Sequence, residues 1–232
     1  MKTLAITFAL LSTTLFAANT LIFEDEFSRN ESQEKKDEIG NGWGSNSKKR
    51  AAGNKQVDLR DGAMHIYIHE AADHAVSVTH EAEFRDGVVE IRFKLEHAQD
   101  KLGLNFADLK FKEVHAGHLF KVTVGTTNVQ IADLKTGVMA SAIRKAKLAK
   151  TLSAAQKAEL KTKAKTQKNA LKLGTWYALR VEIKGSKLSA SIDDKPVLSF
   201  NSPGIAHPTK RMLRLNVPRQ VVVDDLKIYA SK

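Results

Sequence analysis

The sequence of 232 residues contains no cysteine. The fold is therefore expected to be stable without disulfides, and any export signal is not of the lipoprotein type. Several motifs of known chemistry are also missing, namely a nucleophile elbow, a phosphate-binding glycine loop, an HExxH zinc motif and a cysteine pair. Their absence excludes the enzyme classes that depend on them.

Long apolar runs are scarce as well. One near the start, from Leu4 to Phe16, is shorter than the roughly 20 residues that a membrane-spanning helix needs. Lys2 precedes this run and two alanines follow it, an order that is typical of a cleavable secretory signal. We therefore expect residues 1–18 to be a signal peptide and residues 19–232 to form one exported domain, periplasmic or secreted, with no transmembrane segment.

Most of the remaining sequence alternates between apolar and polar residues. The stretch GVVEIRFKLE places Val89, Ile91, Phe93 and Leu95 on one face and mainly charged residues on the other, as in a half-buried strand. Further strands, separated by turn residues, are expected in AMHIYIHE, TWYALRVEIK, KLSASIDD and KPVLSF and at 102–111, 118–124, 128–133, 210–217 and 220–229. A dozen or so short strands predict an all-β sandwich of two sheets.

One segment, about 138–172, has a different composition, rich in Ala, Lys and Leu. A first helix is expected over 138–150, and Ser153 with Gln156 has the form of a capping box that starts a second helix at Ala154. Residues 140–172 hold ten Lys or Arg and one Glu, which is a net +9 out of the formal +11 of the whole chain. The sequence thus predicts a basic helical hairpin inserted between two strands.

This basic hairpin has three candidate roles. It could cover an edge or an end of a sheet as a solvated pair of helices, or it could bind an anionic polymer. It could also hold the protein electrostatically to the cell envelope. Because the segment lacks the aromatic residues that usually interleave with Lys and Arg where single-stranded nucleic acid binds, nucleic acid is not the favoured partner.

The eight histidines are the most suggestive titratable residues. His65, Tyr67 and His69 are spaced to share one face of a strand, and His115 and His118 flank a turn. Histidine transfers protons near neutral pH and is a common metal ligand, although a single strand cannot bring three ligands together. Each histidine could instead be a solvated or internally hydrogen-bonded residue.

Carboxylates offer two further candidates. Glu90 lies two residues from Arg92 on an outward face, which fits either a catalytic carboxylate or an ion-paired surface row. Acidic pairs near the two ends of the domain include Asp25 in FEDEF and Asp225 in VVVDDLKIY. If the first and last strands pair, these two residues could hold a structural calcium; the alternative is simple solvation at turns and strand ends.

The loop SPGIAHPTKR contains two prolines, Pro203 and Pro208. Pro203 with the following glycine predicts a turn, and Pro208 keeps the residue before it extended. We expect this stiff loop to present His207 and Lys210 at the rim of a groove with little ordering cost.

Taken together, LIFEDEFSRNE, GNGWGS, KQVDLRDGAMHIYI, FRDGVVEIRFKLE, LGTWYALRVEIKGSKLSASIDDKPVLSF and VVVDDLKIY resemble a known group of domains. The chain is similar, over about residues 21–229 without the basic hairpin, to secreted concanavalin-like jelly rolls of the 3-keto-disaccharide hydrolase-like or family 16 glycoside hydrolase-like type. The resemblance implies a jelly roll whose concave sheet faces a carbohydrate.

The resemblance also bears on mechanism. Family 16 laminarinases carry an E-x-D-x-x-E strand, whereas EIRFKLE has Arg92 where the aspartate would stand. An enzyme that acts on a 3-keto sugar would instead need a base to remove a proton next to the ketone, often with a metal to polarise it.

We therefore predict an exported carbohydrate-active protein that acts on a glycoside in a groove of the concave sheet. The alternative is a non-catalytic envelope module that binds a glycan or a polyanion. The candidates for proton transfer or catalysis are His207, His118 and Glu90. The candidates for substrate binding are His65, His69, His80, Arg92, Asn105 and Lys210, with Trp43 and Trp176 as stacking platforms.

Overall fold

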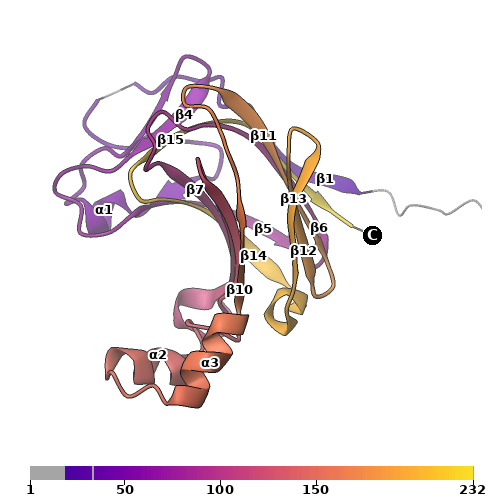
Figure 1. Ribbon diagram of the computed structural model, residues 1–232. Coiled ribbons are helices and arrows are strands. Elements are labelled where there is room, and N and C mark those ends of the chain that lie inside the picture. Colours follow the sequence, from indigo (N-terminus) through magenta and orange to yellow (C-terminus); the bar gives the residue numbers. More distant parts are fainter. Residues whose placement is uncertain (1–18, 33, 232) are drawn as a thin grey trace, which may run out of the picture.

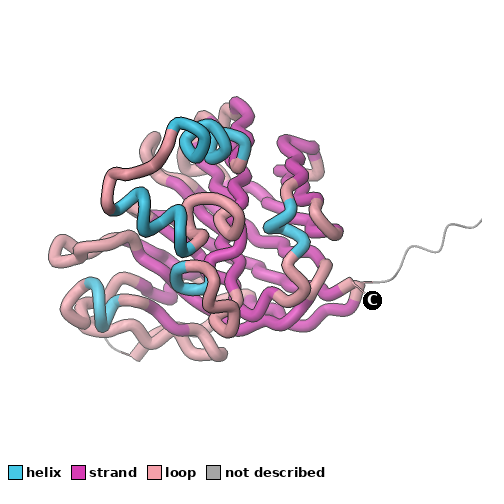
Figure 2. The backbone as a smooth tube through the Cα atoms, turned by 90° about the horizontal axis from the view of Figure 1, so that it is seen from below, coloured by secondary structure: helices cyan, strands magenta, loops and turns pink. Residues whose placement is uncertain are grey.

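The computed structural model describes residues 19–32 and 34–231, so the expected signal peptide at 1–18 lies outside the described residues. Two antiparallel sheets form a sandwich with the helices confined to connections (Figures 1 and 2). The predicted all-β jelly-roll sandwich is confirmed. None of the helices within the described ranges has the length and apolar character needed to cross a bilayer.

One sheet has eight strands, in the order β13-β12-β11-β6-β15-β4-β3, with β1 paired to β15. Their bounds are β1 Thr20–Asp25, β3 Val57–Arg60, β4 Ala63–Tyr67, β6 Gly87–Lys94, β11 Trp176–Lys184, β12 Lys187–Ile192, β13 Lys195–Asn201 and β15 Gln220–Ala230. The first and last strands of the described domain pair with each other, which meets the condition set for a shared site of Asp25 and Asp225.

The other sheet has seven strands, in the order β10-β9-β8-β7-β14-β5-β2. Their bounds are β2 Gly44–Ser45, β5 Val76–Phe84, β7 Lys101–Ala107, β8 His118–Gly125, β9 Asn128–Asp133, β10 Ala164–Lys168 and β14 Lys210–Val217. The strands predicted at 118–124, 128–133, 210–217 and 220–229 are confirmed by β8, β9, β14 and β15.

The core lies between the two sheets and follows the period-two pattern of the sequence. Val89, Ile91 and Phe93 of β6 are buried with Leu213 and Leu215 of β14 in one apolar cluster. Fully burying a side chain of this size stabilises the fold by roughly 1.5–3 kcal/mol. Alternate residues of each strand therefore point either into this core or outward, and the outward faces carry the polar side chains.

The helical hairpin is an insertion in the β9–β10 connection. α2 spans Ser141–Leu148 and α3 spans Ala154–Thr162, and the capping box of Ser153 and Gln156 is present. The predicted helical span was too long, since Ala164–Lys168 forms β10 and pairs with β9. Neither helix has a buried residue, because each is short and consists mainly of alanine and lysine. The two helices are therefore attached to the sandwich mainly where the hairpin begins and ends.

The three other short helices lie in loops. They are α1 Ser47–Arg50 and the 3-10 turns η1 His115–Gly117 and η2 Pro203–Ala206. α1 follows β2, and the backbone N–H of Asn46 donates to the carbonyl of Ser77 in β5. The α1 segment is thereby fixed beside one edge of the seven-stranded sheet, and the α2–α3 pair beside the other.

Candidate functional site

A polar row crosses the outer face of the seven-stranded sheet. The strand register aligns Thr79 of β5 with Arg214 of β14, Asn105 of β7 and Lys121 of β8. The neighbours of these residues along each strand, such as Leu104 and Leu213, belong to the core. Thr79, Arg214, Asn105 and Lys121, which we call the cation row, therefore face away from the core.

His118, at the start of β8, packs on this row. Its Nδ1 lies 3.0 Å from Oδ1 of Asn105 and 3.0 Å from Nη1 of Arg214. The ring is also close to His115 of η1, with 6.3 Å between the ring centroids. A register shift between Phe106 and Ala107 lets the η1 turn bring both histidines over the row.

The charges around His118 are positive. Burial, and after it the neighbouring Arg214, His115, Lys121 and His74, together lower the pKa of His118 to about 4. Burial likewise lowers the pKa of Lys121. The imidazole is therefore neutral at physiological pH, with the cations of the row around it.

Arg214 is the more enclosed of the two cations in the row, with 9% of its surface exposed, and Asn105 beside it is 6% exposed. Its Nη2 donates to the carbonyl of Ala116 at 2.8 Å, and its Nη1 contacts the His118 ring. Across residues 19–32 and 34–231, none of the ion pairs includes Arg214 or Lys121. A buried guanidinium without a carboxylate partner is unusual, because burying a charge costs free energy unless it is paired.

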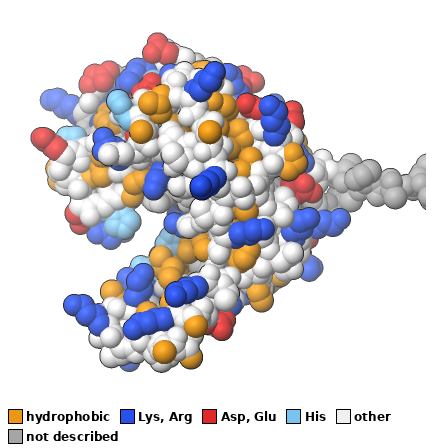
Figure 3. Space-filling model, viewed as in Figure 1, with side chains coloured by type: hydrophobic (Ala, Val, Ile, Leu, Met, Phe, Trp, Pro, Cys, Tyr) orange, Lys and Arg blue, Asp and Glu red, His pale blue; other side chains and the backbone are white. Residues whose placement is uncertain are grey.

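The molecule is hollowed over this face. Figure 3 shows a deep notch between the α1 region and the α2–α3 pair, with histidine, lysine and arginine side chains along it. The hairpin reaches the notch through its first residues, since His115 donates its backbone N–H to Met139 and Ser141 donates to Glu113. The cation row thus lies at the floor of a cleft with two walls.

Other predicted residues lie on the opposite side of the sandwich. Glu90, Arg92 and Trp176 are on the outer face of the eight-stranded sheet, where Glu90 pairs with Arg180, and Arg92 pairs with Asp224 and Asp225 at 3.3 and 3.2 Å. Arg92 also stacks over the Trp176 ring at 5.0 Å. The ion-paired surface row that the sequence offered as the alternative for Glu90 is what the structure contains.

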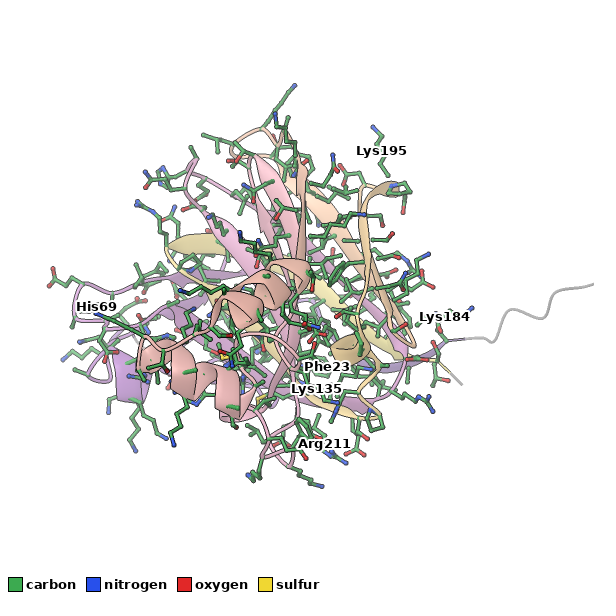
Figure 4. The ribbon with its side chains drawn as sticks, turned by 60° about the horizontal axis from the view of Figure 1, so that its bottom comes forward. Phe23, His69, Lys135, Lys184, Lys195 and Arg211 are labelled. Atoms are coloured by element: carbon green, nitrogen blue, oxygen red, sulfur yellow. The ribbon has the colours of Figure 1, made fainter. Side chains whose placement is uncertain are left out.

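His65 lies on that same outer face. Its Nδ1 is 3.3 Å from Nη2 of Arg60 on the adjoining strand β3, and burial and Arg60 lower its pKa. The expectation that His69 continues the same strand face is wrong, because β4 ends at Tyr67. His69 instead accepts the backbone N–H of Ala71 in a loop, at the side of the molecule away from Arg211 in Figure 4.

His207 does not stand at the rim of a groove. It is 5% exposed, its Nε2 lies 3.1 Å from Oδ2 of Asp108, and its ring packs against Phe111. Asp108 also accepts from Arg211, and Lys135 lies over Phe111, so these groups enclose the histidine at one end of the sandwich (Figure 4). The stiff loop therefore closes the core instead of presenting a side chain.

Lys210 is also internal, with none of its surface exposed. In KRMLRLNV, strict alternation would put Lys210 on the same face as Arg214, but a register shift between Lys210 and Met212 turns it inward. Its Nζ donates to the carbonyls of His207 and Arg85 and lies over the Phe120 ring. The prediction that Lys210 borders a groove is wrong for this reason.

Trp43 and His80 belong to an internal aromatic cluster. Trp43 is buried, and His80 stacks on Phe23 with 3.6 Å between the ring centroids. The Trp43 indole N–H donates to Asp25 at 2.9 Å. Neither aromatic ring is available as a platform for a sugar.

Asp25 and Asp225 do not offer a joint calcium site. Asp25 accepts hydrogen bonds from Arg29, Asn41, Trp43 and the backbone of Phe27, and these partners hold its pKa below the ordinary value despite burial. Asp225 pairs with Arg92. Within the described ranges, no three His, Asp or Glu side chains are grouped as metal ligands.

Of the predicted residues, the structure thus brings only His118 and Asn105 together in the cleft. It adds Arg214 and Lys121, which the sequence reasoning did not select. The signal for both residues was a polar position between core residues, in LRL of β14 and FKV of β8, and this pattern does not distinguish a cleft from an ordinary solvated face.

Most of the chain matches a known family of domains. The model of the 3-keto-alpha-glucoside-1,2-lyase-like domain matches residues 36–228, which is most of the chain. The chain belongs to this family. The match places this lyase-like domain among carbohydrate-active proteins and confirms the resemblance inferred from the sequence. The comparison with curated proteins gives no match.

Solved structures resemble the lyase-like domain in fold. SCLam, a non-specific endo-beta-1,3(4)-glucanase of family GH16, has a TM-score of 0.61 at 12% identity over 95% of this chain and 94% of that one. The laminarinase from Rhodothermus marinus has a TM-score of 0.60 at 12% identity, covering 93% and 98%. The carbohydrate binding module CBM66 from Bacillus subtilis has a TM-score of 0.53 at 12% identity, covering 80% and 93%. At these identities the likeness shows the fold alone.

Proposed function

We propose that the protein is an exported carbohydrate-active enzyme that binds a glycoside in the cleft and cleaves it by removing a proton next to a keto group. The observation that carries this proposal is the neutral His118 among the cations of the row, on the face that the fold leaves concave. The family match supplies the reaction class, since a 1,2-lyase of a 3-keto-alpha-glucoside breaks the bond between C1 and the glycosidic oxygen without water.

His118 is the proposed base in this reaction. A ketone at C3 makes the C2 proton acidic, and a neutral imidazole can accept that proton. The C2–H electron pair then forms the C1–C2 double bond, the C1–O bond breaks, and the imidazolium returns the proton to the leaving oxygen. Asn105, 3.0 Å from Nδ1, is the proposed positioning residue for the ring.

The ammonium group of Lys121 is the proposed electrophile. It lies beside Asn105 in the strand register, and among the described residues it forms no ion pair. A cation placed where an enolate oxygen develops negative charge stabilises the transition state. A divalent metal does not fit this position, because the donors beside His118 are an amide and cations, and no carboxylate joins them in a metal-binding group of the described residues.

The two-carboxylate mechanism has no support on this face. The outward positions of β7, β8 and β14 carry no acid. The acids of β5 on this face do not join His118, because Glu81 lies opposite Met212 and Glu83 pairs with Arg211. Glu90 lies on the other sheet in an ion pair. We therefore propose that this protein shares its fold with the laminarinases but uses His118 in place of two carboxylates.

The test is turnover of a 3-keto-alpha-glucoside by the full chain and two histidine variants. His118→Gln is expected to lower the rate roughly 100-fold or more, the ordinary contribution of a general base. His65→Gln, which removes a half-buried histidine from the outer face of the other sheet, is the matched control and should retain the wild-type rate. Equal rates for wild type and His118→Gln would refute the proposal.

A non-catalytic glycan-binding module is the second candidate. Its support is that His118 is held by two partners, as a fixed binding residue would be, and that the cleft floor is polar across four strands. Glycan binding by wild type without any product, lost in His118→Gln, would favour this alternative over the enzyme.

A further inference from the structure

We infer that the cleft selects a glycan bearing an acidic substituent, a carboxylate or sulfate, which binds the guanidinium of Arg214. This inference rests on the proposed function, in that it assumes the glycan lies on the cation row. It adds an acidic substituent on that glycan, which the family match does not specify.

Arg214 has hydrogen-bonding capacity that the protein does not fill. A guanidinium has five N–H donors. The protein accepts from Nη1 and Nη2 only, so at least two donors remain, one on Nη2 and one on Nε. Nε and Nη2 form an edge of the guanidinium that can bind a carboxylate or sulfate through two parallel hydrogen bonds.

Arg214 also has no counter-charge among the described residues. Arg214 is 9% exposed, and no carboxylate among the described residues pairs with it. Glu81, the acid next to Thr79 on the outward face of β5, lies opposite Met212 and has no ion pair with Arg214 in the described part of the chain. Glu83 pairs with Arg211 instead. An enclosed charge without a partner is explained if the ligand supplies the anion.

The field around the cleft is positive. Burial comes first among the causes that lower the pKa of His115, followed by Arg144 of α2 and Arg214. Burial is likewise the main cause for the lowered pKa of His118, followed by Arg214 and, among the smaller contributions, Lys121. Cations therefore approach the cleft from the sheet, as Arg214 and Lys121, and from the hairpin, as Arg144. A cleft lined by one sign of charge concentrates ligands of the opposite sign.

The contrast with the opposite sheet strengthens the assignment. There Arg92 and Arg180 are neutralised by Asp224, Asp225 and Glu90. Cations that only make a β-sheet surface soluble are expected to be solvent-accessible and paired with acids, as Arg92 and Arg180 are. The cation row of the cleft differs in both enclosure and pairing.

The experiment is calorimetric binding of three oligosaccharides of equal length to the full chain: a glucuronate oligomer, a sulfated glucan oligomer and a neutral glucan oligomer. We expect the better acidic ligand to bind roughly 10-fold or more tightly than the neutral one, as for hydrogen bonds to a charged group. Comparison of the glucuronate and sulfated oligomers shows whether the cleft prefers a carboxylate or a sulfate. The acidic preference should shrink as salt rises.

Variants locate the preference. Arg214→Lys and Lys121→Met should each reduce the acidic preference, and Lys121→Met, at a half-exposed position, keeps the test valid if Arg214→Lys fails to fold. The matched control is the pair Lys145→Met and Lys147→Met on exposed positions of α2. Equal affinity for acidic and neutral oligomers would overturn the inference, as would a preference that persists in the row variants and disappears in the α2 control.

The two proposals fail in distinguishable ways. Loss of acidic selectivity with turnover still dependent on His118 would overturn only the inference about the substrate. Selective binding with no dependence of turnover on His118 would overturn only the proposed reaction.

Discussion

The fully buried Lys210 gives a prediction that can be worked out quantitatively. Burial lowers the pKa of Lys210 from 10.5 to about 8 in the folded protein. The unfolded chain therefore still holds a proton between about pH 8 and 10.5 that the folded protein has released. Stability rises with pH wherever the unfolded state binds more protons, so this residue should raise the free energy of unfolding across that range by roughly 3 kcal/mol.

Lys210→Met removes this contribution while keeping an unbranched side chain of similar length. Below about pH 8 the variant avoids the cost of a buried ammonium but leaves the carbonyls of His207 and Arg85 without their donor, at about 1–3 kcal/mol each. These opposed effects leave a small net change there. Above about pH 10.5 the wild type should gain roughly 3 kcal/mol relative to the variant.

The assay is urea denaturation of both proteins at a series of pH values from about 7 to about 11. Taking the difference between the two proteins cancels the titration of all other groups. Lys184→Met, which removes an exposed lysine of β11, controls for the loss of one positive charge. A difference between wild type and Lys210→Met that stays constant over the whole range would refute the reasoning.

Three further variants probe the account. Asp25→Ala should destabilise the fold by about 3 kcal/mol in urea denaturation, because Arg29, Asn41 and Trp43 lose their acceptor; a loss under about 1 kcal/mol would contradict this hydrogen-bond cluster. Glu90→Gln should cost less than about 1 kcal/mol and leave turnover unchanged, since it removes only an exposed ion pair with Arg180; a large loss of turnover would move the site to the other sheet. Gly117→Ala should destabilise by about 2 kcal/mol or more, because φ is +69° and an added Cβ would overlap the Asp108 carbonyl; equal stability would show that the η1 turn is built differently.

The fold could be predicted from the sequence because alternation reports directly on burial. Val89, Ile91 and Phe93 are buried where the period-two pattern placed them, and the capping box at Ser153 starts α3 as expected. The helix was predicted too long because Ala164–Lys168 has good helix formers, yet pairing with β9 satisfies its backbone better.

The site could be predicted only in part, because alternation says that a residue points outward and not from which sheet. Glu90 and His118 are both outward residues, and only the strand order shows that they lie on opposite faces of the sandwich. Lys210 was predicted to border a groove, and the single register shift between Lys210 and Met212 turns its side chain into the core. The absence of a counter-ion at Arg214 is a property of the packed structure and leaves no trace in the sequence.

The central claim is that the glycan occupies the cleft over the seven-stranded sheet. The most direct test is a backbone amide chemical-shift titration of the full chain with a 3-keto-alpha-glucoside. The account predicts the largest shifts at Asn105, His118 and Arg214, with Glu90, Arg92 and Trp176 unchanged. Shifts concentrated at Glu90, Arg92 and Trp176 would contradict the account.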